Sequence, residues 1–111
     1  MKIRAGIIGT GIGLKHLQAI ENYKHSKVDI LCEKNIKNLK KMKRKFPNKK
    51  IKNNENEIFK NDKINLVSIA SYDDDHYKQI IKSINSGKNI IVEKPMCMNQ
   101  KELKKIYELI K

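Results

Sequence analysis

Short apolar runs alternate along the chain with stretches in which apolar residues are spaced as on one face of a helix. The runs at 3–8, 28–32, 64–70 and 89–93 are rich in Ile, Val and Leu, which is typical of strands buried on both faces of a parallel sheet. Between them, apolar residues recur every three or four positions. The pattern therefore predicts strands and helices in alternation.

Four helices are expected from this spacing. Pro47 ends the second and Gly87 the third, and Asn99 with Glu102 forms a capping box that begins the fourth. Residues 48–63 are mostly polar and are expected to hold a short edge strand and one helical turn. The predicted buried positions of the helices are Leu17, Ile20 and Tyr23; Ile36, Leu39, Met42 and Phe46; Tyr77, Ile80, Ile81 and Ile84; and Leu103, Ile106, Tyr107 and Ile110.

Strands that alternate with helices in this way predict an α/β fold, with a doubly wound parallel sheet of the Rossmann-like class covered on both sides. At 111 residues the chain is expected to form one domain, 1–111. Ligands bind such sheets at the carboxyl ends of the strands. Candidate chemistry should therefore follow Ile8, Cys32, Ala70 and Val92.

A glycine-rich turn follows the first predicted strand. Gly9 permits a tight turn, Gly11 lets the backbone approach a pyrophosphate, and the helix that follows offers free N–H groups. With Thr10 and Ile12 between them, these glycines are predicted to bind a dinucleotide. Gly13 arrives one residue earlier than the third glycine of G-x-G-x-x-G, so we interpret it as a packing or helix-start glycine.

Glu33 closes the second predicted strand, twenty residues after Gly13. A carboxylate at this spacing accepts hydrogen bonds from the adenosine ribose hydroxyls, which favours NAD over NADP. Lys34 can instead pair with a 2′-phosphate, so NADP stays open as the cofactor. A surface Glu at the end of a strand is the structural alternative.

Three stretches carry a resemblance to a known family: GIIGTGIGLKH at 6–16, IASYDDDHYKQII at 69–81 and SGKNIIVEKPM at 86–96. On these three stretches, the chain resembles the N-terminal half of the Gfo/Idh/MocA oxidoreductases. The resemblance implies transfer of hydride between a nicotinamide cofactor and a sugar, cyclitol or related polyol. The resemblance implies that Lys94, beside Glu93 in the E-K-P tripeptide, is the catalytic residue at the nicotinamide end of the cofactor.

The resemblance is partial in the middle stretch. Ser71 and His76 match the family pattern in kind and are expected to border the nicotinamide ribose, whereas Tyr72 and Asp73 depart from it. For His76, packing beneath the loop is the alternative. His16 has a family counterpart, for which its helical position favours a structural role.

The D-x-x-x-H helix that the family carries in its substrate domain is absent from this sequence. We therefore expect a dinucleotide-binding domain that is truncated before its last strand, is inactive alone, and belongs to a protein that oligomerises through the missing domain. A non-catalytic dinucleotide-binding or scaffold module is the alternative.

Charge and cysteine content bear on other classes of protein. The chain has 25 Lys and Arg against 12 Asp and Glu, and ten of the basic residues lie in 34–52 without an acidic one. Nucleic-acid binding is the less favoured explanation, since this block has one aromatic residue. Cys32 and Cys97 belong to no metal motif and are expected to be packed thiols. Without a signal or spanning segment, we expect a cytoplasmic protein.

Overall fold

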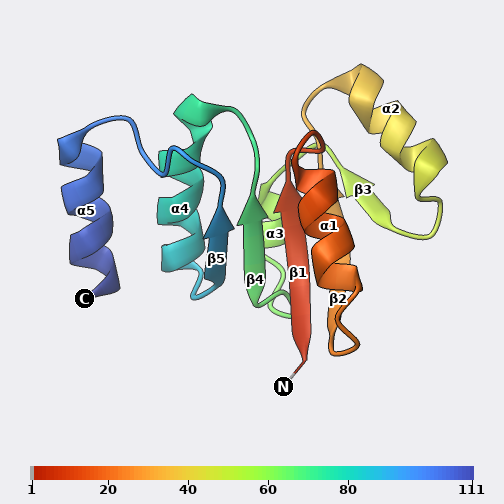
Figure 1. The fold of residues 1–111 in the computed structure, drawn as a ribbon, viewed down its shortest axis with the longest axis horizontal. Helices are drawn as coiled ribbons and strands as arrows, with labels where there is room; N and C mark the ends of the chain where they lie inside the picture. Colours follow the sequence, from red (N-terminus) through yellow and green to blue (C-terminus); the bar gives the residue numbers. More distant parts are fainter. Residues whose placement is uncertain (1) are drawn as a thin grey trace.

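The computed structural model describes residues 2–111, in which strands and helices alternate as predicted (Figure 1). The strands are β1 (Ile3–Ile8), β2 (Ser26–Cys32), β3 (Lys50–Lys52), β4 (Leu66–Ile69) and β5 (Asn89–Val92). The helices are α1 (Gly13–Glu21), α2 (Ile36–Lys45), α3 (Asn56–Phe59), α4 (His76–Asn85) and α5 (Gln100–Ile110), with a 3₁₀ turn, Asp73–Asp75, before α4.

The five strands form one parallel sheet in the order β3-β2-β1-β4-β5. The predicted doubly wound α/β fold is confirmed. The chain reverses its direction of winding between β1 and β4, so the loops after these two strands meet at the carboxyl edge of the sheet. Backbone hydrogen bonds from Gly9 N–H to the Cys32 carbonyl and from Ala70 N–H to the Ile8 carbonyl, 2.9 and 2.8 Å, join the three strand ends there.

Two hydrophobic layers hold helices on opposite faces of the sheet. Ile7, Leu31 and Met42 belong to the layer under α1 and α2, whereas Ile69 and Ile80 belong to the layer under α3 and α4. Each fully buried side chain of this size contributes about 1.5–3 kcal/mol to stability. The buried β1 and β4 at the centre therefore fix the position of the loops that follow them.

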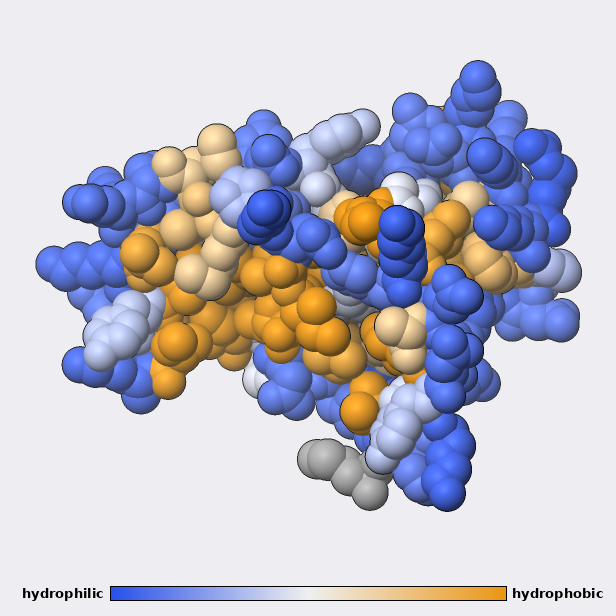
Figure 2. All heavy atoms as spheres, in the orientation of Figure 1, coloured by the Kyte–Doolittle hydropathy of each residue, from blue (hydrophilic) through white to orange (hydrophobic). Residues whose placement is uncertain are grey.

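One predicted helix face is only partly buried. In α5, Ile106 is 4% exposed, but Leu103, Tyr107 and Ile110 are 47%, 56% and 64% exposed. The helix packs beside α4 rather than on the sheet (Figure 1). Ile91 of β5 is also 44% exposed, so the prediction of a sheet covered on both sides is wrong at β5. No element within residues 2–111 covers this side of β5, and Figure 2 shows a broad apolar area over that half of the molecule.

Two further apolar residues lie outside the core. Tyr23 follows the end of α1 and is 53% exposed, and Ile36 begins α2 and is 61% exposed. Both stand at helix ends, where the chain turns away from the sheet. The prediction that they are buried is therefore wrong.

Candidate cofactor site

The three glycines after β1 have three different surroundings. Gly9 has a φ of +98°, and a Cβ there would lie 2.4 Å from the Ala70 carbonyl oxygen. At Gly13 a Cβ would meet the Ile7 side chain at 3.0 Å, whereas at Gly11 it would meet nothing within 4 Å. Gly9 is thus required by the turn, Gly13 allows α1 to pack closely on β1, and Gly11 faces open space.

Open backbone donors lie at the start of α1. Leu14 and Lys15 N–H bond to the carbonyls of Gly11 and Ile12, but the N–H groups of Gly11 and Ile12 find no acceptor among residues 2–111. The helix also begins without a side-chain cap. Free N–H groups and the positive end of the helix dipole favour an anion such as a pyrophosphate. This part of the chain therefore fits the phosphates of a dinucleotide.

Glu33 is bonded to the glycine turn. Its Oε1 accepts from the backbone N–H of Thr10 at 3.2 Å and from the Thr10 hydroxyl at 2.5 Å, while Oε2 accepts from Asn35 N–H at 2.9 Å. The carboxylate thus joins the end of β2 to the turn after β1. Since two carboxylate oxygens offer about four acceptor sites, room is left for a ribose hydroxyl.

A cavity of about 220 Å³ lies beside this contact. Lys34 and Asp75 both line it and form an ion pair, with Nζ and Oδ2 3.5 Å apart. The cavity therefore adjoins the glycine turn, the Glu33 carboxylate and the loop after β4. Its lining residues are Ile8, Gly9, Thr10, Gly11, Cys32, Glu33, Lys34, Asn38, Ala70, Ser71, Tyr72 and Asp75.

His76 does not line this cavity. Its ring is 1% exposed, and its nitrogens face two backbone carbonyls, Nδ1 at 2.7 Å from Pro95 O and Nε2 at 3.0 Å from Ser71 O. The side chain of Ser71 donates to Gln79, which donates in turn to Glu55. His76 therefore joins the loops after β4 and β5 from beneath them.

His16, on α1, reaches across the sheet to the end of β5. Its Nε2 lies 2.6 Å from the Glu93 carboxylate and its Nδ1 contacts the buried Ser68 hydroxyl. Because a carboxylate only accepts, Nε2 is the donor in the contact with Glu93. Serine, histidine and glutamate also form hydrolytic triads, but Ser68 is 0% exposed and is no nucleophile.

Lys94 follows Glu93 at the carboxyl end of β5. Its side chain is exposed, and it forms no ion pair within the described part of the chain. The backbone N–H of Glu93 bonds to the Ile69 carbonyl at 2.9 Å, which ties this end of β5 to β4. Lys94 thus stands at the same edge of the sheet as the glycine turn.

Cys32 lines the cavity and carries an unreactive thiol. Burial, followed by the nearby carboxylates of Glu55 and Glu33, raises the pKa of its thiol to about 12, and Lys34 opposes the shift only weakly. At neutral pH the thiol stays protonated. Cys32 therefore packs as a small apolar residue beside the site.

Residues 3–111 match the family model described as an oxidoreductase family with an NAD-binding Rossmann fold. The chain belongs to the Gfo/Idh/MocA oxidoreductases. It is an NAD-binding Rossmann domain of that family, as the sequence predicted. The members of the family it matches are longer, and the chain spans about a third of their length, 31% of one curated relative and 33% of two solved structures.

Three relatives illustrate the similarity. An uncharacterised oxidoreductase of Schizosaccharomyces pombe is 28% identical over 98% of this chain. Scyllo-inositol dehydrogenase of Lactobacillus casei, solved with NAD(H) and scyllo-inositol, has a TM-score of 0.86 at 23% identity over 99% of this chain. Myo-inositol 2-dehydrogenase of Lactobacillus plantarum has a TM-score of 0.85 at 23% identity over 99% of this chain. These structures share the fold with this domain.

The described residues contain no helix that is long and apolar enough to span a membrane. Across the same residues, no group of three or more His, Cys, Asp or Glu side chains is placed to hold a metal ion. The candidate ligand-binding features at the carboxyl edge are therefore the glycine turn, the Glu33 carboxylate and the end of β5.

Proposed function

We propose that this domain holds NAD(H) for hydride transfer to or from a sugar, cyclitol or related polyol. The observation that carries the proposal is the arrangement at the switch point of the sheet. There the open glycine turn stands between Glu33, at the end of β2, and Lys94, at the end of β5. The relative that was solved with NAD(H) and scyllo-inositol supports the polyol class.

Each part of the edge takes one part of the cofactor. The N–H groups of Gly11 and Ile12 bind the pyrophosphate, and Glu33 accepts from the adenosine ribose on the β2 side. Thr10 keeps Glu33 oriented through its two hydrogen bonds. The carboxylate also repels a 2′-phosphate, so we propose NAD as the preferred cofactor, with NADP disfavoured.

On the β5 side, Lys94 is the proposed catalytic residue. The bound nicotinamide ring supplies the hydride acceptor or donor. The exposed ammonium of Lys94 stabilises negative charge that develops on the substrate oxygen. His16 and His76 act as positioning residues, because they bond to Glu93 and Pro95 on either side of Lys94. Ser71 borders the same region through its loop.

The test is calorimetric titration of NAD and NADP into the chain and into Glu33→Gln. The substitution keeps an acceptor oxygen for Thr10 but removes the charge. We expect NAD affinity to fall about tenfold or more, since hydrogen bonds to charged groups contribute about 1.5–3 kcal/mol. NADP affinity should hold or rise. Glu108→Gln, on the exposed side of α5, is the matched control and should change neither affinity.

Equal loss of NAD and NADP affinity in Glu33→Gln would show that the carboxylate only supports the turn. Turnover is a separate question, which needs a protein that includes a substrate domain.

The two free cysteines support a cytoplasmic, reducing compartment. Oligomerisation through the substrate domain stays a proposal as well.

A further inference from the structure

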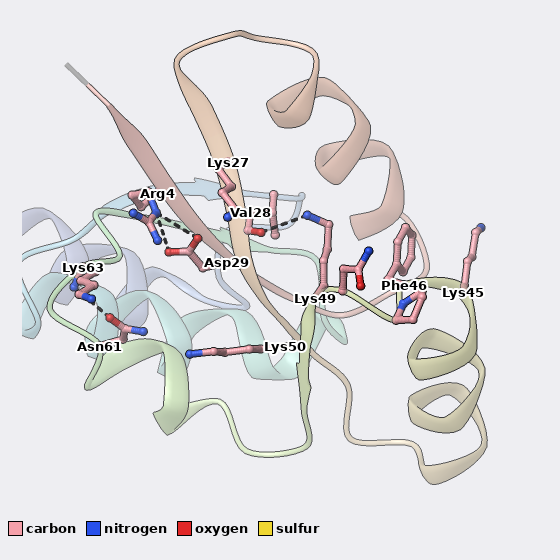
Figure 3. A pocket seen from close by; sticks show the side chains of 12 residues that line it. Arg4, Lys27, Val28, Asp29, Lys45, Phe46, Lys49, Lys50, Asn61 and Lys63 are labelled. Carbon is pink, nitrogen blue, oxygen red and sulfur yellow. Dashed lines mark hydrogen bonds and ion pairs between the residues drawn. The ribbon is translucent and has the colours of Figure 1, made fainter.

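A second hollow lies at the opposite edge of the sheet from the glycine turn, near the starts of the strands (Figure 3). Its volume is about 580 Å³, within the range of about 300–1,000 Å³ that is usual for small-ligand sites. Its walls come from β1, β2, the start of β3, the end of α2 and the segments that follow α2 and α3. Cofactor binding at the carboxyl edge makes no use of it.

Its walls carry a large excess of positive charge. The one acidic lining residue is Asp29. Within residues 2–111, only Arg4 and Lys49 of the basic lining residues have a carboxylate within 4.0 Å. The basic lining residues are Arg4, Lys27, Lys45, Lys49, Lys50 and Lys63.

These cations converge from separate parts of the chain. Arg4 belongs to β1, Lys27 to β2, Lys50 to β3, and Lys63 follows α3. The lysine-rich block at 34–52 therefore explains only part of the cluster. Folding that brings like charges together is unfavourable unless a counter-charge screens them, so the hollow has a positive potential suited to an anion.

Arg4 is held in a fixed orientation inside this cluster. Its Nε donates to both carboxylate oxygens of Asp29, at 3.0 and 2.8 Å, and the side chain stays 39% exposed. Its two terminal Nη groups have no acceptor in the part of the chain described. A guanidinium fixed in this way offers paired N–H donors, which match the oxygens of a phosphate.

Lys49 has a different task. Its ammonium bonds to Glu21 and to the Val28 carbonyl, so it fastens the loop after α2 to β2. Phe46, the one aromatic lining residue, is half-buried and packs against the core beneath α1 and α2. The hollow therefore lacks an exposed ring on which the bases of a nucleic-acid strand would stack.

We propose that this hollow binds a small polyanion with clustered phosphate groups, of the di- or triphosphate class. The Arg4 guanidinium and the Lys27, Lys50 and Lys63 ammonium groups supply the donors. Because the hollow has a limited volume and offers donors but no stacking surface, it suits a compact phosphate chain better than an extended nucleic acid. The site is separate from the glycine turn, which lies at the other edge of the sheet.

The experiment titrates inorganic tripolyphosphate into the chain and into Lys50→Gln/Lys63→Gln. Both lysines are exposed and unpaired in the region described, so the variant should fold, which circular dichroism verifies. We expect affinity to fall about tenfold or more when two charges are lost from the site. Lys104→Gln/Lys105→Gln on α5 removes the same charge elsewhere and should change affinity less than about twofold.

A third variant, Arg4→Lys, keeps the charge but removes the paired donors, and it should weaken binding severalfold. Three results would overturn the proposal. They are no binding of tripolyphosphate by the wild-type chain, equal loss in the two double variants, and tighter binding of a single-stranded oligonucleotide at equal phosphate concentration. Failure of NAD to bind would leave this outcome unaffected, since none of these residues lies at the cofactor edge.

Discussion

The turn at Gly9 gives a direct test of how the cofactor site is built. In Gly9→Ala the new methyl would lie 2.4 Å from the Ala70 carbonyl oxygen and 2.7 Å from its carbon, both of them backbone atoms that cannot rotate away. A Cβ in left-handed backbone costs about 1–2 kcal/mol, and overpacking against fixed atoms adds about 1–3 kcal/mol. We therefore expect the free energy of unfolding to fall by about 2–5 kcal/mol.

Two other glycines separate these contributions. Gly87 has a φ of +70° but open space at its Cβ position, so Gly87→Ala should show the backbone term alone, about 1–2 kcal/mol. Gly11 has neither a positive φ nor a neighbour within 4 Å. Gly11→Ala should therefore stay within about 1 kcal/mol of the wild type, while its methyl obstructs the proposed pyrophosphate site.

Urea denaturation followed by circular dichroism measures all three variants. With a slope of about 1–3 kcal/mol per molar urea, Gly9→Ala should lower the midpoint by about 0.7–5 M. Equal midpoints for Gly9→Ala and Gly87→Ala would refute the reasoning, because the contact with Ala70 would then carry no cost. Unfolding of Gly11→Ala would show that this position is structural rather than open.

Three further predictions follow from single contacts. Iodoacetamide should modify Cys97 but not Cys32 in the native protein, because burial raises the pKa of Cys32 to about 12; labelling of both before urea is added would contradict this. Lys88→Met should destabilise the fold by about 1–3 kcal/mol, since the ammonium donates to two carbonyls at 2.8 Å. Burial lowers the pKa of Lys88, so the unfolded chain binds the proton more tightly than the folded protein does. The difference in stability between the wild type and Lys88→Met should therefore widen as pH rises from neutral towards the ordinary Lys pKa of about 10.4. A difference that narrows in urea titrations would be inconsistent with the assignment. His16→Ala should weaken NADH binding by roughly fivefold while sparing ADP-ribose, which lacks the nicotinamide; equal losses by calorimetry would place His16 outside the nicotinamide half.

Much of the fold could be predicted from the sequence because its signals are local. Strand β1 spans the predicted residues, and α4 stops before Gly87, whose φ of +70° ends the helix. Asn99 accepts from Glu102 N–H at 2.9 Å, as the capping box requires. Periodicity and caps depend on residues a few positions apart, so they can be recognised without knowing the neighbours in space.

The sequence also predicted that the candidate residues lie at one edge of the sheet. Gly9, Glu33 and Lys94 each follow a strand, and the carboxyl ends of parallel strands meet at one edge whatever the details of packing. It did not predict which contacts these residues make. The bond from Thr10 to Glu33 depends on how separate segments pack. For His76 the sequence left two alternatives open, and the structure shows the one in which the ring is buried beneath the loop.

The sequence by itself therefore determined the order of elements, the glycine turn and the edge of the sheet at which the candidate cofactor residues meet. Only the tertiary structure decided that Ser68, His16 and Glu93 form one hydrogen-bonded chain, and that Arg4 and Lys63 share a basic hollow. It also decided that α5 keeps three apolar residues exposed. The reason is the same in each case: helical spacing marks a face as apolar, but what covers that face, and which distant side chain reaches it, depends on segments far apart in the chain.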